Sequence, residues 1–271
     1  MIDWMRYRWL YLLISGIVLI SGIFSMVKWG FKFGIDFTGG IVAEYKFPNG
    51  ESKIFKYTPK SNEESEKIRE DFKSQGATEI RFENVGPSIG PELIKKTIIA
   101  LSVSATVILF WVAYQFKSIK FGVSATLATL HDSLVLLGMF SLFGHFFGAE
   151  VDFLFVTTVL TILSFSVHDT IVVYDRIRES QKKFKGNIYP KDKLVYDLAN
   201  QALSETMVRS LNNSFTIIFM LLALILMGGE STKWFSVALL VGTISGTYSS
   251  PFVAVPILVT WDELQKKFKK G

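Results

Sequence analysis

Ionisable residues lie in long apolar stretches of this sequence or at their edges, where a charged side chain needs a partner. His131 and Asp132 lie near the middle of one stretch, and His168 and Asp169 lie in the second half of the next. Arg209 stands where a later stretch begins. A charge at the bilayer centre costs at least about 2.5–3.5 kcal/mol, so such residues usually face other helices and are paired. These five side chains are therefore the candidates for chemistry.

Asp169 and Arg209 are opposite in charge and matched in depth. At a rise of about 1.5 Å per residue, Asp169 lies about 9 Å from the end of its apolar stretch, and Arg209 lies on the same side. We expect a switchable pair, in which ionised Asp169 attracts Arg209 and protonation releases it. Cyclic protonation of this kind could convert a proton gradient into helix movement. The alternative is a permanent ion pair that only fixes helix packing.

The other candidates have less specific signals. Asp132 has no evident arginine partner, and hydrogen bonds from Ser or Thr of adjacent spans would satisfy it. His131 lies about 100° around the helix from Asp132 and need not face it. His168 could relay protons, or it could simply hydrogen-bond a neighbouring helix.

The elements that position these residues are membrane-spanning helices. The chain has 271 residues, 49% of them hydrophobic, and a mean hydropathy of +0.35. A helix needs about 20 apolar residues to cross the hydrocarbon core. The sequence predicts an α-helical polytopic membrane protein with six spans, at about residues 9–28, 97–116, 122–143, 153–174, 211–227 and 235–260.

Basic residues set the expected orientation. They cluster before the first span, between spans two and three, between spans four and five, and at the end of the chain. Cytoplasmic loops carry an excess of Lys and Arg, so both termini are expected in the cytoplasm. The net charge of +5 is then explained by basic loops that face the anionic lipid of the bilayer, and no nucleic acid partner is expected.

The chain divides at these boundaries into six segments. They are an N-terminal cytoplasmic segment with the first span (1–28), an external α+β domain (29–96), spans two to four (97–174), a cytoplasmic amphipathic loop (175–210), spans five and six (211–260) and a basic cytoplasmic tail (261–271). In the fourth of these, apolar residues from Leu194 to Leu203 recur at helical spacing. We expect that helix to lie along the membrane surface, with a solvated connector as the alternative.

The external domain has short-range signals of its own. Alternating residues predict strands at Ile41–Phe47, Lys53–Tyr57 and Thr78–Phe82, the first followed by a turn at Pro48–Gly50. Ser61 and Glu64 form a capping box that opens a helix reaching about Gln75. A domain of this size has a marginal core, so we expect it to dock on a partner or the membrane.

Several classes of site are not supported. The chain has no cysteine, which excludes disulfides and thiol chemistry. It shows no metal-ligand spacing, nucleophile elbow or phosphate loop, so neither an enzyme nor a cofactor is expected. Gly242, Gly246 and Ser250 recur at four-residue spacing, which favours close helix packing, and Pro251 and Pro256 are expected to bend the last span.

Four motifs, in order along the chain, carry a resemblance to a known family. They are Gly34-Ile35-Asp36-Phe37-Thr38-Gly39-Gly40, Val85-Gly86-Pro87-Ser88-Ile89-Gly90-Pro91-Glu92-Leu93, the run Ser166–Glu179 that leaves span four, and Arg209-Ser210-Leu211. The chain resembles the SecF branch of the SecD/SecF family of bacterial protein-export membrane proteins. In the first motif, Asp36, Phe37, Gly39 and Gly40 match the family signature.

This resemblance implies a fold, partners and a site. It implies one six-span half of the RND-superfamily fold, in a heterodimer with SecD in the bacterial cytoplasmic (inner) membrane. It also implies work beside the SecYEG translocon, with YajC and YidC as further partners, on an unfolded translocating polypeptide and with protons as the energy source. The family's proton-pathway residues fall on Asp169 and Arg209, completed by a SecD carboxylate. Where the family usually has asparagine, this chain has His168.

Two other functions remain open at this stage. One is half of an RND-type exporter of lipids or small molecules, although such proteins have larger external domains and two fused halves. The other is a non-transporting scaffold for membrane-protein assembly. A scaffold would keep its function when Asp169 and Arg209 are both replaced by neutral residues of similar size.

Overall fold

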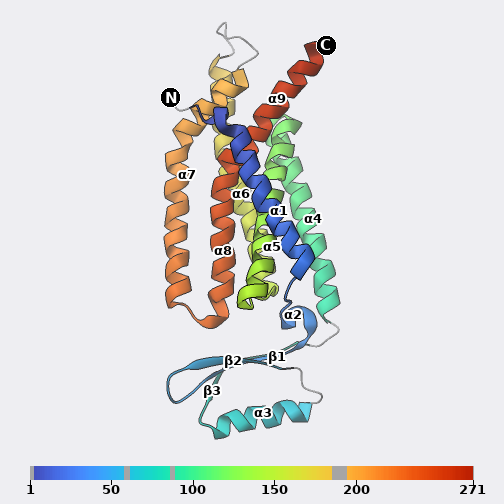
Figure 1. Ribbon diagram of the computed structural model, residues 1–271, viewed down its shortest axis with the longest axis vertical. Helices are drawn as coiled ribbons and strands as arrows, with labels where there is room; N and C mark the ends of the chain where they lie inside the picture. Colours follow the sequence, from blue (N-terminus) through green and yellow to red (C-terminus); the bar gives the residue numbers. More distant parts are fainter. Residues whose placement is uncertain (1–2, 58–61, 86–88, 185–193, 271) are drawn as a thin grey trace.

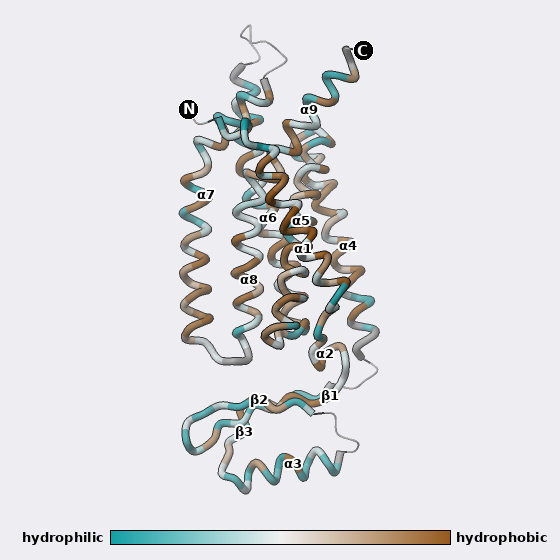
Figure 2. The backbone as a smooth tube through the Cα atoms, in the orientation of Figure 1, coloured by the Kyte–Doolittle hydropathy of each residue, from teal (hydrophilic) through white to brown (hydrophobic). Residues whose placement is uncertain are grey.

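The six apolar stretches form six membrane-spanning helices in the computed structural model, which describes residues 3–57, 62–85, 89–184 and 194–270. Figure 2 shows the apolar residues concentrated along these helices. The spans are α1 (Arg8–Trp29), α4 (Ile89–Phe116), α5 (Ile119–Phe147), α6 (Phe153–Phe184), α7 (Leu194–Met227) and α8 (Glu230–Ser249), the last continuing through η2 (Ser250–Ala254) into α9 (Val255–Lys270). The predicted polytopic helical fold is confirmed.

The spanning helices fall into two groups that differ in how much of each helix is buried. About half of each of α5, α6 and the α8–η2–α9 run is buried by the chain itself, whereas α1, α4 and α7 are mostly exposed. The first three elements therefore form the centre of the bundle. Asp132 and Asp169 both lie on central helices, which is where a buried charge finds partners other than lipid.

Small residues let α8 approach α6 closely. A Cβ atom added at Gly242 would clash with the side chain of Ile162, and one added at Gly246 would lie 3.3 Å from the ring of Phe165. One turn further, the Ser250 hydroxyl lies 3.0 Å from that of Thr170. All three small residues at four-residue spacing on α8 and its continuation thus face α6, as small residues at helix contacts do.

The last span changes helix type where it contains proline. Residues Ser250–Ala254 form a π-helical turn, η2, with Pro251 at its start. Proline cannot donate to the helical ladder, and wider turns of this kind accommodate the interruption. The expected bend is therefore a local insertion in the helix, at the level of the two buried carboxyl groups.

The segment between spans four and five differs from the expected loop. Helix α6 continues to Phe184 and α7 already begins at Leu194, so much of 175–210 extends these two helices. Leu198 and Leu203 are buried, and Asn200 accepts a hydrogen bond from the Met5 backbone N–H at 2.9 Å. The apolar face thus packs on the N-terminal turn η1 (Trp4–Tyr7) instead of on the membrane surface. Likewise, the expected tail at 261–271 continues α9 as far as Lys270.

The external domain is a three-stranded sheet covered by one helix. Its strands β1 (Gly40–Lys46), β2 (Ser52–Tyr57) and β3 (Thr78–Val85) pair antiparallel in the order β2-β1-β3, and helix α3 spans Asn62–Ser74. In Figure 1 the sheet lies between α3 and the helical bundle. All three predicted strands and the helix are present, while Ser61 of the expected capping box lies outside the described residues.

Aromatic side chains fill the small core of this domain. Tyr45 stacks on Phe72 of α3 with ring centroids 4.4 Å apart, and Arg69 of α3 lies over the Phe82 ring at 4.3 Å. The Arg69 guanidinium also bonds both oxygens of Glu79 at 2.9 Å. Aromatic and charged contacts hold α3 on the sheet, which compensates for a core of few aliphatic side chains.

Both termini lie at the end of the bundle opposite the sheet domain (Figure 1). Six crossings bring the chain back to the side on which it began, as the charge pattern of the loops predicts. We refer to this side as the terminal end and to the other as the sheet end.

Candidate functional site

Asp169 is buried at the contact between α6 and α7. Its side chain is 8% exposed, and both of its carboxyl oxygens accept a hydrogen bond from the Ser210 hydroxyl, at 2.8 and 2.7 Å. Ser210 precedes the apolar half of α7. The immediate partner of Asp169 is therefore a neutral hydroxyl group.

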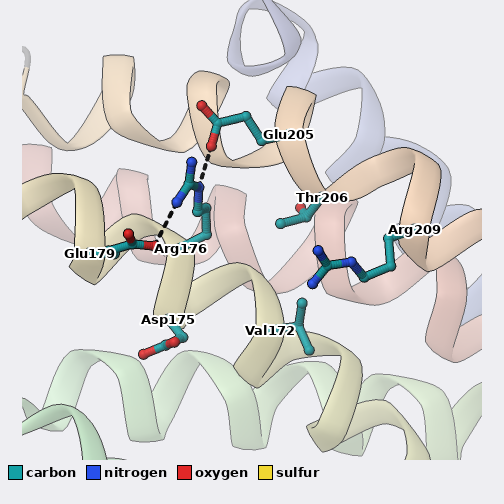
Figure 3. A pocket seen from close by; sticks show the side chains of 7 residues that line it. All are labelled: Val172, Asp175, Arg176, Glu179, Glu205, Thr206 and Arg209. Carbon is teal, nitrogen blue, oxygen red and sulfur yellow. Dashed lines mark hydrogen bonds and ion pairs between the residues drawn. The ribbon is translucent and has the colours of Figure 1, made fainter.

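Arg209 points into a cavity (Figure 3), and no ion pair joins it to Asp169 among the described residues. Its side chain is exposed and helps to line a cavity of about 450 Å³ between α6 and α7. Within the described residues, Arg209 makes no ion pair. The cavity is lined by Val172, Asp175, Arg176, Glu179, Glu205, Thr206 and Arg209.

This cavity lies beside Asp169 on the terminal end of the bundle. Val172, which lines it, is three residues along α6 from Asp169, hence about one turn away. Arg176 joins the two helices there by bonding Glu205 on α7 and Glu179 on α6, the latter at 2.6 Å. Figure 3 shows both contacts as dashed lines, with the Arg209 guanidinium apart from them.

The arrangement keeps the protonation of Asp169 independent of a fixed ion pair. A hydroxyl group can donate to a carboxylate and can accept from a carboxylic acid. Ser210 can therefore stay bonded to Asp169 in either protonation state, while Arg209 lines the cavity at the same contact between α6 and α7. The permanent ion pair considered above is not the arrangement that the structure has.

Asp132 on α5 lies in a cage of serine hydroxyls. It is fully buried and accepts hydrogen bonds at 2.6 Å from three serines of two neighbouring helices, Ser166 on α6 and Ser245 and Ser249 on α8. The expectation that Ser or Thr side chains satisfy Asp132 agrees with this geometry. His131 does face its neighbour, since its Nδ1 lies 3.2 Å from Asp132 Oδ1.

His168 faces outward from the bundle. Its side chain is exposed, and no described residue of this chain hydrogen-bonds it. Thr157, Thr161 and Ser164 are also exposed on α6, and their spacing puts them on the same face as His168. A polar stripe therefore runs along the outside of a central spanning helix.

The motif around Asp36 joins the sheet domain to the bundle. The short helix α2 (Ile35–Thr38) follows a backbone bridge in which Gly34 N–H donates to Val151 O at 2.8 Å. Asp36 then accepts from the Phe153 N–H at 2.7 Å and so caps α6. Gly39 and Gly40 have φ of +74° and +131°, backbone angles that glycine adopts without strain.

A second carboxyl group at this joint gives a pH-dependent prediction. Burial raises the pKa of Asp152 above its usual range, the Phe155 N–H bond opposes this, and the nearby Asp36 charge adds to it. A carboxyl group with a raised folded-state pKa stabilises the fold at acid pH and loses that contribution as pH rises. We expect Asp152→Asn, which keeps a cap, to raise the unfolding temperature of the purified complex at neutral pH.

This advantage should vanish in acid, where Asp152 is protonated in both folded and unfolded chains. The exposed Asp71→Asn variant on α3 is the matched control. A constant difference between Asp152→Asn and the unmodified protein at all pH values would contradict the assignment.

Comparison with known proteins decides the family. Residues 64–264 match the family described as protein export membrane protein SecD/SecF, C-terminal, and residues 24–47 match the SecD/SecF GG motif. The chain belongs to the SecD/SecF family. It is accordingly a multi-pass protein of the bacterial inner membrane with an accessory role in Sec-dependent protein export, as the sequence predicted.

SecD/SecF relatives match over nearly the whole chain. The protein translocase subunit SecF of Thermobaculum terrenum is 35% identical over 97% of this chain and 94% of its own length. That of Anaerolinea thermophila is 33% identical over 100% and 98%. The protein translocase subunit SecDF of Thermus thermophilus is 33% identical over 88% of this chain but only 35% of its own length.

Solved SecD/SecF structures have the same fold. The crystal structure of SecDF, a translocon-associated membrane protein from Thermus thermophilus, superposes with a TM-score of 0.81 at 31% identity over 96% of this chain. A SecDF crystal structure in a super-membrane-facing form gives 0.72 at 30% identity over 98%. This chain spans less than two fifths of each of those proteins, 38% and 39%.

The sequence predicted Ser or Thr donors for Asp132 but did not identify Ser166, Ser245 or Ser249, nor Ser210 as the donor to Asp169. Ser210 stands within the SecD/SecF motif Arg209-Ser210-Leu211, where charge complementarity favours its neighbour Arg209 as the partner of Asp169. Ser245 and Ser249 are four residues apart and so share one helix face. That spacing was a usable signal for a polar face on α8, although it does not indicate which helix the face contacts.

Proposed function

We propose that this chain is the SecF-like half of a SecD–SecF complex that uses the proton-motive force to assist Sec-dependent translocation of unfolded polypeptide. The observation that carries the proposal is Asp169, a carboxyl group buried in a spanning helix, hydrogen-bonded to Ser210 and placed beside a cavity that Arg209 lines. A buried ionisable group in a membrane helix marks a proton or ion pathway by default.

The proposed cycle couples the charge on Asp169 to the contact between α6 and α7. When Asp169 is protonated, it is neutral and stays bonded to Ser210. When it loses the proton, its negative charge in a low-dielectric site attracts the Arg209 guanidinium out of the cavity. Because Arg209 is on α7 and Asp169 is on α6, each protonation change moves one helix relative to the other, and the sheet domain at the far end follows.

The exposed stripe on α6 supports the SecD partnership. Polar side chains gain little from lipid, so the face of His168 and Ser164 needs a covering that can hydrogen-bond. The Thermus relative that carries both names, SecDF, matches this chain over about a third of its length, which leaves room for a second half. That second half would supply the further carboxylate of the proton pathway. We further propose SecYEG, YajC and YidC as partners and a cytoplasmic location for the terminal end, where the basic loops lie.

The test is export into membrane vesicles that contain the SecD–SecF complex, with and without a proton gradient. We expect Arg209→Gln to lower the gradient-dependent part of export at least about tenfold, which corresponds to about 1.4 kcal/mol. Gradient-independent export should stay unchanged.

The matched control is Arg178→Gln, also on the terminal end. Arg178 donates to the backbone oxygen of Gln115 at 2.9 Å and does not line the cavity. Full gradient-dependent stimulation by the Arg209→Gln complex would refute the proposed countercharge.

A further inference from the structure

Asp132 is a second buried carboxyl group for which the proposed cycle has no use. It is fully buried on α5, and the Ser166, Ser245 and Ser249 hydroxyls donate to its two oxygens at 2.6 Å. Three central elements, α5, α6 and α8, thus converge on one carboxyl group. Hydroxyl donors stabilise a carboxylate, but they do not neutralise its charge.

The charge of Asp132 has one available countercharge. Within the described residues, His131 is the only basic side chain at ion-pair distance from Asp132, with Nδ1 and Oδ1 3.2 Å apart. A fully buried carboxylate without a cation is strongly disfavoured. A proton must therefore be held between the two side chains, either on the His131 ring or on Asp132 itself.

Few other titratable groups face this pair. Helix α6 contributes Asp169 and Tyr174, and the Tyr174 hydroxyl lies 2.6 Å from that of Ser124. Tyr248 on α8 donates to the Tyr11 backbone oxygen on α1 at 2.9 Å.

The remaining elements packed on α5 supply no charge near the pair. Helix α9 contributes Asp262, which pairs with Lys120 at the terminal end of α5. Helix α1 is charged only at its two ends, at Arg8 and Lys28. Helix α4 has no charged residue between Thr97 and Phe116, and η2 has none. Among the described residues of the spanning helices, Asp169 is the other buried carboxyl group, and His168 beside it on α6 is exposed.

The same two short segments hold both carboxyl groups. On α6, Ser166 donates to Asp132, and Thr170 donates back to the Ser166 backbone oxygen at 2.9 Å. At the junction of α8 and η2, Ser249 donates to Asp132. The adjacent Ser250 lies 3.0 Å from Thr170 and reaches Asp169.

This junction is also where the helix changes type. π-Helical turns often mark functional sites, because their backbone groups are less tightly paired. A charge change on either carboxyl group alters the hydroxyl bonds of the same segments, so the two sites are physically connected.

The His131 ring has a second face, away from Asp132. Its Nε2 and the Ser15 hydroxyl are buried, and no described residue hydrogen-bonds either atom. Both residues line a cavity of about 370 Å³ between α1, α5 and α8, together with Ser245. The other lining residues, apart from Tyr248, are apolar, so this face of the ring offers Nε2 no hydrogen-bond partner among the described residues.

We propose that His131 and Asp132 form a second proton-binding site, which holds one exchangeable proton and is coupled to Asp169 through the hydroxyls of α6 and of the α8–η2 junction. This inference rests on the proposed proton-coupled function. The site lies closer to the sheet end than Asp169, because Ser166 precedes Asp169 by about one turn of α6. Whether the His131–Asp132 site holds its proton sets the proton affinity of Asp169.

The chain contains three histidines, which makes the test direct. The complex with SecD is labelled with ¹⁵N-histidine, and the His131 signals are assigned by their absence from the His131→Gln complex. Ring nitrogen shifts are then followed with pH in the unmodified and the Asp169→Asn complexes. Because Nδ1 faces Oδ1, these shifts report a proton on either member of the pair.

We expect the His131 signals to titrate, and their apparent proton affinity to change at least about fivefold in Asp169→Asn, the lower range of coupling between linked sites. His145, which stacks on Trp29 at the sheet end of α5, should not change. Signals of His131 that do not move with pH, or that move identically in both complexes, would overturn the second site.

The export assay separates the two proposals. If Asp169→Asn removes gradient-dependent export while His131 is unresponsive, only the second site is wrong. If Asp169→Asn leaves gradient-dependent export intact, the proposed function itself is wrong.

Discussion

The Asp169→Asn complex is expected to lose all gradient-dependent stimulation of export while it still assembles with SecD. Asparagine has the size of aspartate and keeps an oxygen that can accept the Ser210 hydrogen bond, so the contact between α6 and α7 is retained. What it lacks is a proton to bind and release. Because Arg209 then meets no changing charge, the two helices have no reason to move. Vesicles with an imposed proton gradient measure the loss.

Two controls make this prediction specific. Asp197→Asn changes an exposed carboxyl group on α7 outside the cavity and should export as the unmodified complex does. Co-purification of SecD with the Asp169→Asn chain checks assembly. A complex with Asp169→Asn that still speeds export under a gradient would end the proton-switch hypothesis and would favour a scaffold.

The spans and their depth could be predicted because the bilayer imposes both. A run of about 20 apolar residues has one stable arrangement in lipid, and the rise per residue then places Asp169 within it. The neighbours of Asp169 could not be predicted in the same way. Arg209 and Ser210 are adjacent on α7 and therefore differ by about 100° in direction. Depth in the membrane does not show which of the two faces Asp169. Charge complementarity favoured Arg209, which points into the cavity.

Amphipathic segments show a similar limit. The apolar residues that begin with Leu194 were expected to meet lipid, whereas the buried ones, such as Leu198 and Leu203, meet the N-terminal turn. Helical periodicity indicates that one face is apolar. It does not indicate whether lipid or protein covers that face, because both are favourable environments for leucine. The decisive contact, between Asn200 and the Met5 backbone, joins residues 195 positions apart.

The roles of the glycines and serines on α8 depend on the neighbouring helix. The spacing of Gly242, Gly246 and Ser250 predicted a close contact but not its partner. Only the fold shows that Ile162, Phe165 and Thr170 of α6 fill that contact. The same contact brings Ser249 to Asp132, so close packing and the polar cage are consequences of one helix crossing.

The Gly242→Ala variant is expected to destabilise the complex, although alanine is the better helix former. A Cβ at this position would lie 2.5 Å from Ile162 Cδ1 and 3.0 Å from its Cγ2, and a β-branched side chain on a helix has few other rotamers to adopt. Overpacking of this kind costs about 1–3 kcal/mol, more than the roughly 1 kcal/mol gained in helix propensity. Thermal unfolding of the purified complex measures the net loss.

Shortening the Ile162 side chain should reverse the sign of the stability change that Gly242→Ala causes. Ile162→Ala alone leaves a cavity and destabilises by about 2–5 kcal/mol, but in that background the Cβ of Gly242→Ala has room, so the second substitution should cost nothing or stabilise. Gly16→Ala on α1, with no atom within 4 Å of its added Cβ, is the control for helix propensity and should stabilise in either background. Additive losses in the double variant would show that the α6–α8 contact relaxes freely. In that case the crossing would be too soft to hold the serine cage and Asp169 in register, since both depend on the same approach of α8 to α6.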